Sequence, residues 1–319
     1  MNSDFKSYLL KITQSESCEE IEVIQSLWSG YGKIVRYELD NDSDKTVVAK
    51  NILLKQATAH PRGWNTNNSH NRKVKSYQVE TNWYENWNDL CNENCRTPKF
   101  LGSFSQEQNQ WILLEDLDTN FPLRKQNISI SEVKACLKWL ANFHGWFLSQ
   151  KPTGLWEIGT YWNLETRPDE FEKIENIELK SKVHLIDEAL NDCKYQTILH
   201  GDAKVANFCF SNRCKKVAAV DFQYVGGGCG MKDVAYFLGS CLSSSELETH
   251  EKELLDFYFL ELKKAIQLDI DFNELEKEWR ELYPFACTDF TRFLLGWMPS
   301  HQKVNEYNLK MMKSVLGSL

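Results

Sequence analysis

Apolar residues recur in short β-rich runs through the first third of the chain. Residues 34–39 and 46–50 are two such runs, and turn-forming residues occupy 28–32 and 41–44. This pattern is typical of an antiparallel hairpin. Two more strand-like runs, 100–104 and 111–114, flank a polar loop. An antiparallel sheet is therefore expected in this region.

Helical patterns precede and interrupt these runs. Ser17 and Glu20 have the spacing of a capping box before an apolar run, which predicts a helix within residues 1–28. Residues 57–73 are polar and irregular, which indicates a surface loop, and a helix is expected over 75–91.

Beyond residue 117 the pattern becomes mainly helical. Residues 130–148 form a strongly amphipathic stretch with Ser129 or Ser131 as its cap, and 168–192 and 244–280 are charged and helical. The fold class is therefore α+β. We expect a unit with an antiparallel sheet over residues 1–117 and a larger, mainly helical unit over 118–319, since 319 residues suffice for about two domains.

Composition excludes several classes of protein. A hydrophobic fraction of 42% can build a core, which rules out a disordered or collagen-like chain. The net charge of −8 argues against a nucleic-acid partner, because phosphate affinity comes mainly from Lys and Arg. The ten cysteines form no CxxC pair and predict free thiols in a reducing compartment. Neither a signal peptide nor a membrane-spanning run is visible, so a cytoplasmic location without a membrane partner is expected. Oligomeric state stays open.

The most informative residues lie between 198 and 230. His200-x-Asp202 is followed by Asn207, and Asp221 comes fourteen residues later. A β-like run ends before His200, and two more follow Asn207 and precede Asp221. A hairpin of these last two runs would bring Asn207 and Asp221 together.

These residue types suit phosphoryl transfer. Mg²⁺ prefers oxygen ligands, and Asn207 and Asp221 offer two of them. Asp202 could accept a hydrogen bond from an attacking hydroxyl while the metal neutralises charge. Taken alone, the run from His200 to Asn207 is equally compatible with a capped turn. Asp221 on a separate strand favours the functional interpretation.

His200, Gly201 and Asp202, with Asn207 and Asp221, resemble the catalytic loop and metal-binding Asp of the protein-kinase-like superfamily. The form HGD…N…DFQ is similar to its small-molecule branch, which includes aminoglycoside phosphotransferases, choline kinases and the ecdysteroid-kinase-like group. Residues 283–305 look most like that last group. The resemblance implies a two-lobed kinase-like fold, ATP and Mg²⁺ as cofactors, and a small-molecule hydroxyl as the acceptor.

The resemblance also implies a nucleotide site in the first unit. Gly30 and Gly32 lie where a glycine-rich loop would cover phosphates, although a plain hairpin turn explains them as well. Lys50 resembles the strand lysine that pairs the ATP phosphates; the alternative is an exposed strand lysine. Glu80, on the apolar face of the helix over 75–91, is its expected partner, because a buried carboxylate needs one. Glu85, one turn further, is the alternative.

Two more positions complete the implied site. Backbone groups near Glu115 and Leu117 would hold the adenine, and Asp116 need not contact the base. Lys204 either contacts the γ-phosphate or is a solvated loop lysine.

Several residues have weaker interpretations. His144 is expected to be a buried core histidine, His200 an orienting residue and Asp233 a support for the catalytic loop. The glycines 226–228 allow close backbone approach or form a flexible loop. Five aromatic residues line an acceptor pocket or belong to the core: Phe285, Phe290, Phe293, Trp297 and Tyr307.

The expected function is transfer of the ATP γ-phosphoryl group to a hydroxyl of a small molecule. One alternative is a catalytically silent nucleotide-binding scaffold, which the intact set of Asp202, Asn207 and Asp221 disfavours. A protein kinase is less expected because no APE-like segment follows Asp221. A purely structural hairpin in another α+β protein also remains. Aminoglycosides, choline and steroid-like alcohols all remain open as acceptors.

Overall fold

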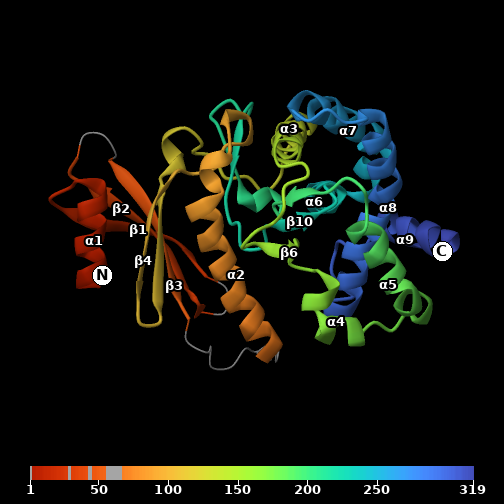
Figure 1. Cartoon of the computed structure of the whole chain (residues 1–319), viewed down its shortest axis with the longest axis horizontal. Coiled ribbons are helices and arrows are strands. Elements are labelled where there is room, and N and C mark those ends of the chain that lie inside the picture. Colours follow the sequence, from red (N-terminus) through yellow and green to blue (C-terminus); the bar gives the residue numbers. More distant parts are fainter. Residues whose placement is uncertain (1, 28–29, 42–44, 55–66) are drawn as a thin grey trace.

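An antiparallel sheet of five strands forms the first part of the computed structural model, which describes residues 2–27, 30–41, 45–54 and 67–319. The strand order is β1-β2-β3-β5-β4 (Figure 1). Its strands are β1 (Cys18–Ser26), β2 (Gly32–Leu39), β3 (Thr46–Leu53), β4 (Phe100–Gln106) and β5 (Asn109–Glu115). Both expected hairpins are therefore present. Of the predicted turns and loop, residues 28–29, 42–44 and 57–66 lie outside the described residues.

A helix covers each face of this sheet. Strand residues that alternate along β2, β3 and β5 pack against Phe5 and Leu9 of α1 (Ser3–Thr13). The intervening residues, among them Ile112, face α2 (Asn67–Asn86). This alternation, which follows from the two-residue period of a strand, puts Lys50 on the α2 side of β3.

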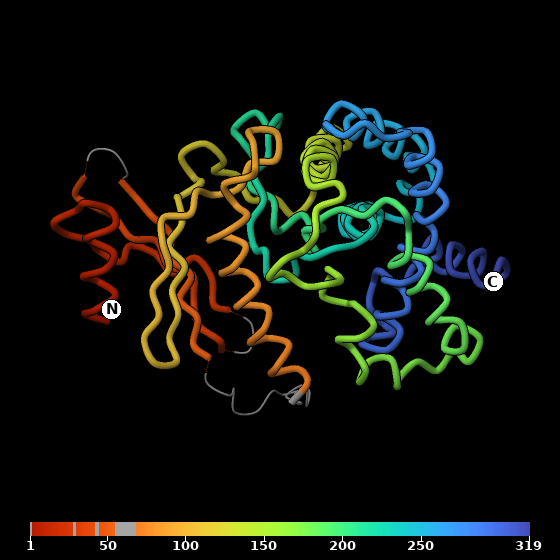
Figure 2. Tube along the Cα trace, in the orientation of Figure 1, coloured from red at the N-terminus to blue at the C-terminus, as the bar shows by residue number. Residues whose placement is uncertain are grey.

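The rest of the chain is mainly helical and lies beyond α2 (Figure 1). The N-cap of helix α3 (Ile130–Trp146) is Ser129, whose backbone N–H donates to Glu132 at 2.7 Å, as a capping box requires. The other helices are α4 (Pro168–Glu172), α5 (Ile177–Asn191), α6 (Met231–Cys241), α7 (Ser244–Ala265), α8 (Phe272–Trp297) and α9 (Glu306–Ser318). The two termini lie at opposite ends of the molecule (Figure 2).

Two small sheets sit among these helices. The order of the first is β6-β10-β7, and β8 pairs with β9 in the second. Their strands are β6 (Trp156–Ile158), β7 (Thr197–Leu199), β8 (Phe208–Phe210), β9 (Val217–Ala219) and β10 (Gly226–Gly228). The α+β fold class is confirmed. The exact boundary near residue 117 stays a prediction.

Two predictions about helices are wrong. The helix expected within residues 1–28 ends at Thr13, and the apolar run beyond Ser17 forms β1 instead. Its β-branched residues favour a strand, and pairing with β2 satisfies their backbone. The expected loop over 57–73 is helical from residue 67 onward. This first part of α2 is polar because it faces a cavity, and its Arg72 and Lys73 line that cavity.

All ten cysteines are free thiols, as expected, and six of them are buried. Among the described residues, no helix combines the length and the apolar character needed to cross a membrane.

The three glycines 226–228 form the central strand β10, so the alternative of a flexible loop is wrong. A Cβ on Gly226 would lie 2.3 Å from the Trp156 carbonyl oxygen of β6. We expect Gly226→Ala to lower the free energy of unfolding by about 1–3 kcal/mol. Gly239→Ala is the matched control, because a Cβ there, inside α6, meets nothing within 4 Å. Urea unfolding midpoints measure both; equal midpoints would contradict this packing.

Candidate active site

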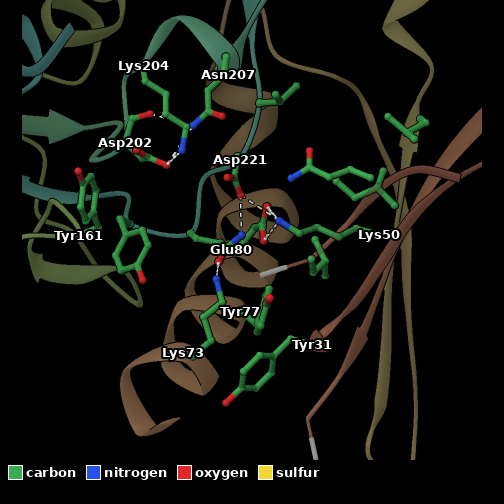
Figure 3. Close-up of a pocket in the computed structure, with 18 of the residues that line it drawn as sticks. Tyr31, Lys50, Lys73, Tyr77, Glu80, Tyr161, Asp202, Lys204, Asn207 and Asp221 are labelled. Atoms are coloured by element: carbon green, nitrogen blue, oxygen red, sulfur yellow. Dashed lines mark hydrogen bonds and ion pairs between the residues drawn. The ribbon is translucent and has the colours of Figure 1, made fainter. Parts of the chain in front are cut away.

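A cavity of about 1060 Å³ lies where the five-stranded sheet and α2 face the helical part (Figure 3). Lys50 of β3 and Glu80 of α2 line one side. Asp202, Asn207 and Asp221, from the loops around β8 and β9, line the other. Folding therefore brings together five residues that are spread over more than half of the chain.

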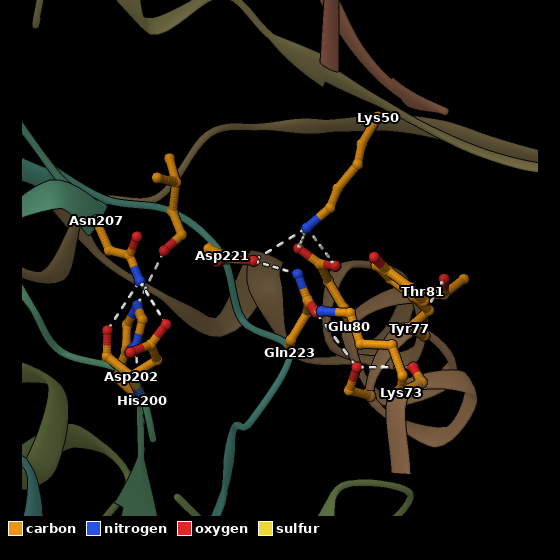
Figure 4. Close-up of polar contacts among 12 residues, drawn as sticks. Lys50, Lys73, Tyr77, Glu80, Thr81, His200, Asp202, Asn207, Asp221 and Gln223 are labelled. Atoms are coloured by element: carbon orange, nitrogen blue, oxygen red, sulfur yellow. Dashed lines mark hydrogen bonds and ion pairs between the residues drawn. The ribbon is translucent and has the colours of Figure 1, made fainter. Parts of the chain in front are cut away.

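Lys50 and Glu80 form a buried ion pair. The Lys50 ammonium lies 2.7 and 2.8 Å from the two carboxylate oxygens of Glu80 and 3.0 Å from Asp221 Oδ1 (Figure 4). Only 4% of Lys50 and 1% of Glu80 is exposed. Burial acts to lower the pKa of Lys50, but the two carboxylates outweigh it and raise the pKa. Glu85, the alternative partner, is exposed and accepts a hydrogen bond from Ser103.

Breaking this pair should destabilise the protein strongly. Lys50→Met leaves the Glu80 carboxylate buried without its cation, which costs about 3–5 kcal/mol in comparable sites. We expect the double variant Lys50→Met/Glu80→Gln to lose less than the sum of the two single losses, because the uncompensated charge is removed with its partner. Glu85→Gln should stay within about 0.5 kcal/mol of the parent. Denaturant unfolding of the four variants gives the coupling, and strict additivity would contradict it.

The loop after β7 is held rigidly. Gly201 has φ +79°, and a Cβ there would lie 1.9 Å from the Tyr224 carbonyl oxygen, so only glycine fits. The Asp233 carboxylate accepts hydrogen bonds from the amides of His200 (2.6 Å) and Gly201 (3.0 Å). Asp233 also contacts His144 Nε2 at 3.2 Å, which makes both His144 and Asp233 structural, as predicted.

His200 orients the same loop. Its Nδ1 accepts from the Asp202 amide (3.2 Å), and its Nε2 lies 3.1 Å from the Val220 carbonyl, to which it donates. Burial lowers the pKa of His200, which favours this neutral form. The ring packs against Phe222 in a tilted arrangement, with 4.7 Å between centroids, and so joins the loop to the segment after β9 that carries Asp221.

Three donors fix the Asp202 carboxylate. Lys204 Nζ (2.8 Å) and Asn207 Nδ2 (3.2 Å) donate to Oδ2 (Figure 3). The Tyr236 hydroxyl (3.0 Å) donates to Oδ1. Burial acts to lower the pKa of Lys204, but Asp202 and Asp221 raise it, so its ammonium stays charged. Lys204 is thus not a freely solvated loop lysine.

Asn207 and Asp221 present oxygens suited to a hard cation. Asn207 Oδ1 and Asp221 Oδ2 have no hydrogen-bond partner among the described residues, while Lys50 and Gln223 hold Asp221 Oδ1. The amide of Val220, next to Asp221, donates to the Asn207 carbonyl at 3.0 Å, which sets the two positions side by side. Asp221 also has φ +71°, a strained value that accompanies functional positions.

This donor set fits Mg²⁺, which commonly uses one or two protein oxygens together with phosphates and waters. No group of three or more His, Cys, Asp or Glu side chains in the described part of the chain could hold a metal ion. Asn207 and Asp221 supply two oxygens, which leaves the other positions of an Mg²⁺ ion to phosphate oxygens and waters.

Only some of the residues expected to bind the nucleotide line the cavity. Glu115 and Leu117 line the cavity, and the Glu115 side chain is turned to Arg96 and the Lys99 amide, so only its backbone could meet a base. Gly30 and Gly32 have positive φ, and a Cβ on Gly32 would lie 2.0 Å from the Asn51 carbonyl oxygen. The cavity wall itself contains their neighbours rather than these two glycines.

The Asp116 carboxylate forms an ion pair with Arg36. The Nε of Arg36 donates to the Asp116 carboxylate at 2.7 Å, and Asp118 binds the same guanidinium. Burial acts to raise the pKa of Asp116, but hydrogen bonds from Arg36 and the Asp118 amide lower it. The Asp116 side chain therefore links β2 to the segment after β5. Its contacts in the structure are structural, and it is not needed to bind an adenine base.

Sequence reasoning missed a polar cluster around Gln223. This side chain donates to Asp221 Oδ1 (2.6 Å) and accepts from Lys73 (2.7 Å) and Ser76 (3.2 Å) of α2. Its position directly after Asp221-Phe222 was the available signal. Tyr236, which binds Asp202, was missed too; it lies three residues beyond Asp233, about one turn further along α6.

Aromatic residues form the other end of the cavity. Of the five candidates, Phe293 and Trp297 border the cavity, although Phe293 is itself buried. Phe290 and Tyr307 are buried away from it, and Phe285 packs against the core. Tyr161 lines the wall as well (Figure 3). Its amide donates to the Gly201 carbonyl at 3.2 Å, so the aromatic end is joined directly to the loop that carries Asp202.

Comparison with solved structures identifies the fold. A microcompartment-associated aminopropanol kinase is similar over 98% of this chain and 94% of its own, with a TM-score of 0.54 and 13% identity. An amicoumacin kinase in complex with AMP-PNP, Ca²⁺ and Ami is similar over 100% and 95%, with a TM-score of 0.50 and 10% identity. The chain therefore shares the overall fold of these two small-molecule kinases.

The sequence places the chain more narrowly. Residues 158–268 match the family model of the ecdysteroid kinase-like family. A comparison with curated proteins gives no match. The resemblance inferred from His200, Asp202, Asn207 and Asp221 is confirmed: this part of the chain matches that family model, and the whole chain is similar in fold to a small-molecule kinase.

Proposed function

We propose that this protein transfers the γ-phosphoryl group of ATP to a hydroxyl of a small molecule. The observation that carries the proposal is the arrangement at Asp202. Its carboxylate is held by three donors at one side of the cavity. It lies next to Asn207 and Asp221, each of which has one carboxamide or carboxylate oxygen without a hydrogen-bond partner among the described residues. Phosphoryl transfer needs this division, in which one carboxylate orients the hydroxyl and separate oxygens hold the cation.

Each residue has a proposed role. Lys50, held by Glu80, binds the phosphates of ATP, and backbone groups near Glu115 and Leu117 contact the base. Asn207 and Asp221 hold Mg²⁺, which neutralises phosphate charge. Asp202 accepts the hydrogen bond of the attacking hydroxyl and takes up its proton. Lys204 lies beside it and stabilises negative charge on the transferred group. Gly30 and Gly32 shape the turn over the phosphates.

ADP release from Mg·ATP in the presence of pooled hydroxylated metabolites tests the proposal, with nucleotide binding measured in parallel. Acceptor-dependent ADP release supports a small-molecule kinase, and dividing the pool identifies the acceptor. Nucleotide binding without release for any acceptor would favour the silent scaffold. Failure to bind Mg·ATP would contradict the proposal.

Two alternatives are weaker. A silent scaffold does not need the three donors that hold Asp202 in place. A protein kinase is disfavoured because no APE-like segment follows Asp221 in the sequence.

A further inference from the structure

The aromatic end of the cavity carries more positive charge than its own carboxylates balance. Arg72 of α2, Arg167 before α4 and Lys173 after α4 line it, against Asp169 and Glu170. Arg72 contacts Thr166, and Arg167 contacts Tyr161 and Glu170. Lys50, where the proposed nucleotide phosphates would sit, contacts Glu80 and Asp221 instead.

Arg167 is fixed in an orientation that leaves one nitrogen available. Its Nε donates to the Tyr161 carbonyl at 2.6 Å, and its Nη1 lies 3.0 Å from Glu170. Its guanidinium carbon is 5.0 Å from the Phe293 ring centroid and 5.7 Å from that of Tyr161. Nη2 has no hydrogen-bond partner among the residues that the structure describes. Arg167 is also mostly buried, with 9% exposed.

Arg72 brings a second guanidinium to the same place. It donates to the Thr166 carbonyl at 2.9 Å and to Ser69 at 3.3 Å. These contacts hold the guanidinium close to the start of α4. Burial and the charge of Arg167 lower the pKa of Arg72, although a guanidinium stays charged near neutral pH. Two like charges facing one cavity repel each other, and a bound anion would remove that repulsion.

A continuous wall links this pair to Asp202. The Tyr236 hydroxyl binds Asp202 at 3.0 Å, and the rings of Tyr236 and Tyr161 lie 5.6 Å apart. Tyr161 in turn contacts Arg167 and the ring of Phe293. The ring centroids of Tyr161 and Phe293 lie 5.5 Å apart. A molecule with its hydroxyl at Asp202 would lie along Tyr161 and end at Arg167.

From this arrangement, and resting on the proposed function, we propose that the acceptor is an organic anion. It carries its hydroxyl at one end of an aromatic or apolar body and a carboxylate, or another oxyanion such as a sulfonate, at the other. The anion binds Arg167 and Arg72, and the body packs on Tyr161, which Phe293 supports from behind. Polycationic acceptors are disfavoured, because they would meet two guanidinium groups.

Matched probes separate charge from shape. 4-(Hydroxymethyl)benzoate, its methyl ester and 4-(aminomethyl)benzyl alcohol share one body with negative, neutral and positive ends. The corresponding biphenyl series tests a longer body, and 4-(hydroxymethyl)benzenesulfonate distinguishes a carboxylate site from a general oxyanion site. Calorimetry measures their binding to the protein saturated with Mg·AMP-PNP, and ADP release with ATP measures turnover.

We expect the anion to bind at least about 10-fold more tightly than the ester and the amine in one of the two series. Arg167→Met and Arg72→Met should each remove most of that preference, through KM rather than kcat, and leave binding of the ester unchanged. Arg213→Gln, on an exposed turn, is the control and should keep the preference. Because Arg72 is only half-buried, Arg72→Met still tests the proposal if the Arg167→Met protein fails to fold.

The outcomes separate this inference from the proposed function. A preference for the amine or the ester, a preference that survives both arginine substitutions, or no binding of any probe to the nucleotide complex would overturn the anionic acceptor. The proposed kinase function would stand in each case as long as Mg·ATP binds. Loss of Mg·ATP binding itself would instead contradict the kinase function.

Discussion

Asp202→Asn should reduce acceptor-dependent ADP release by about 10²–10⁴-fold while nucleotide affinity stays within a factor of about two. The substitution keeps the size of the side chain but removes the charge and the ability to take up a proton. Asp202 makes no contact with Lys50 or Glu80, and its partners are Lys204, Asn207 and Tyr236. The effect should therefore fall on kcat rather than on nucleotide binding.

Asp269→Asn is the matched control, since Asp269 is exposed in the loop between α7 and α8. It makes the same chemical change and should leave turnover unaltered. Steady-state ADP release and titration with a fluorescent ADP analogue measure both quantities. Turnover that persists in Asp202→Asn at more than about a tenth of the parent rate would remove Asp202 from its proposed role.

Much of the fold could be predicted from local patterns. Strands β2, β3, β4 and β5 follow from alternating β-rich runs between turn residues, and α3 follows from its apolar stripe and the cap at Ser129. Strand β1 was missed because the Ser17 and Glu20 spacing suggested a cap, and only pairing with β2 decides its conformation. Strand β10 was missed since three glycines carry no hydrophobic signal. Their lack of side chains is what lets β6 and β7 approach.

The site divides in the same way. The Lys50–Glu80 pair could be predicted because a carboxylate on an apolar helix face requires a buried cation. The side-by-side placement of Asn207 and Asp221 followed from one local hairpin. Gln223 and Tyr236 could not be assigned, because their roles depend on contacts between α2, the catalytic loop and α6.

The aromatic end of the cavity was the part of the site that the sequence predicted least, for a physical reason. Its wall combines Arg72, which lies on a turn that sequence polarity assigned to a loop, with Tyr161 and Phe293 from distant segments. Helical spacing of the aromatics in α8 cannot tell Phe293, which reaches the cavity, from Phe290, which packs against Trp162. Charge at this end emerges only from the tertiary arrangement.

Asp221→Asn should weaken the apparent Mg²⁺ affinity of the nucleotide complex by at least about 10-fold, or ~1.4 kcal/mol. The substitution removes the negative charge that faces the cation, and Asn is chosen since it tolerates the φ of +71° better than Ala does. Lys50 keeps Glu80 as its partner, so the fold should survive. Magnesium titrations of ADP-analogue binding measure the effect, with Asp269→Asn again as the control. An unchanged magnesium requirement in a folded Asp221→Asn protein would exclude Asp221 as a ligand and leave Asn207 without the second oxygen that the proposed site needs.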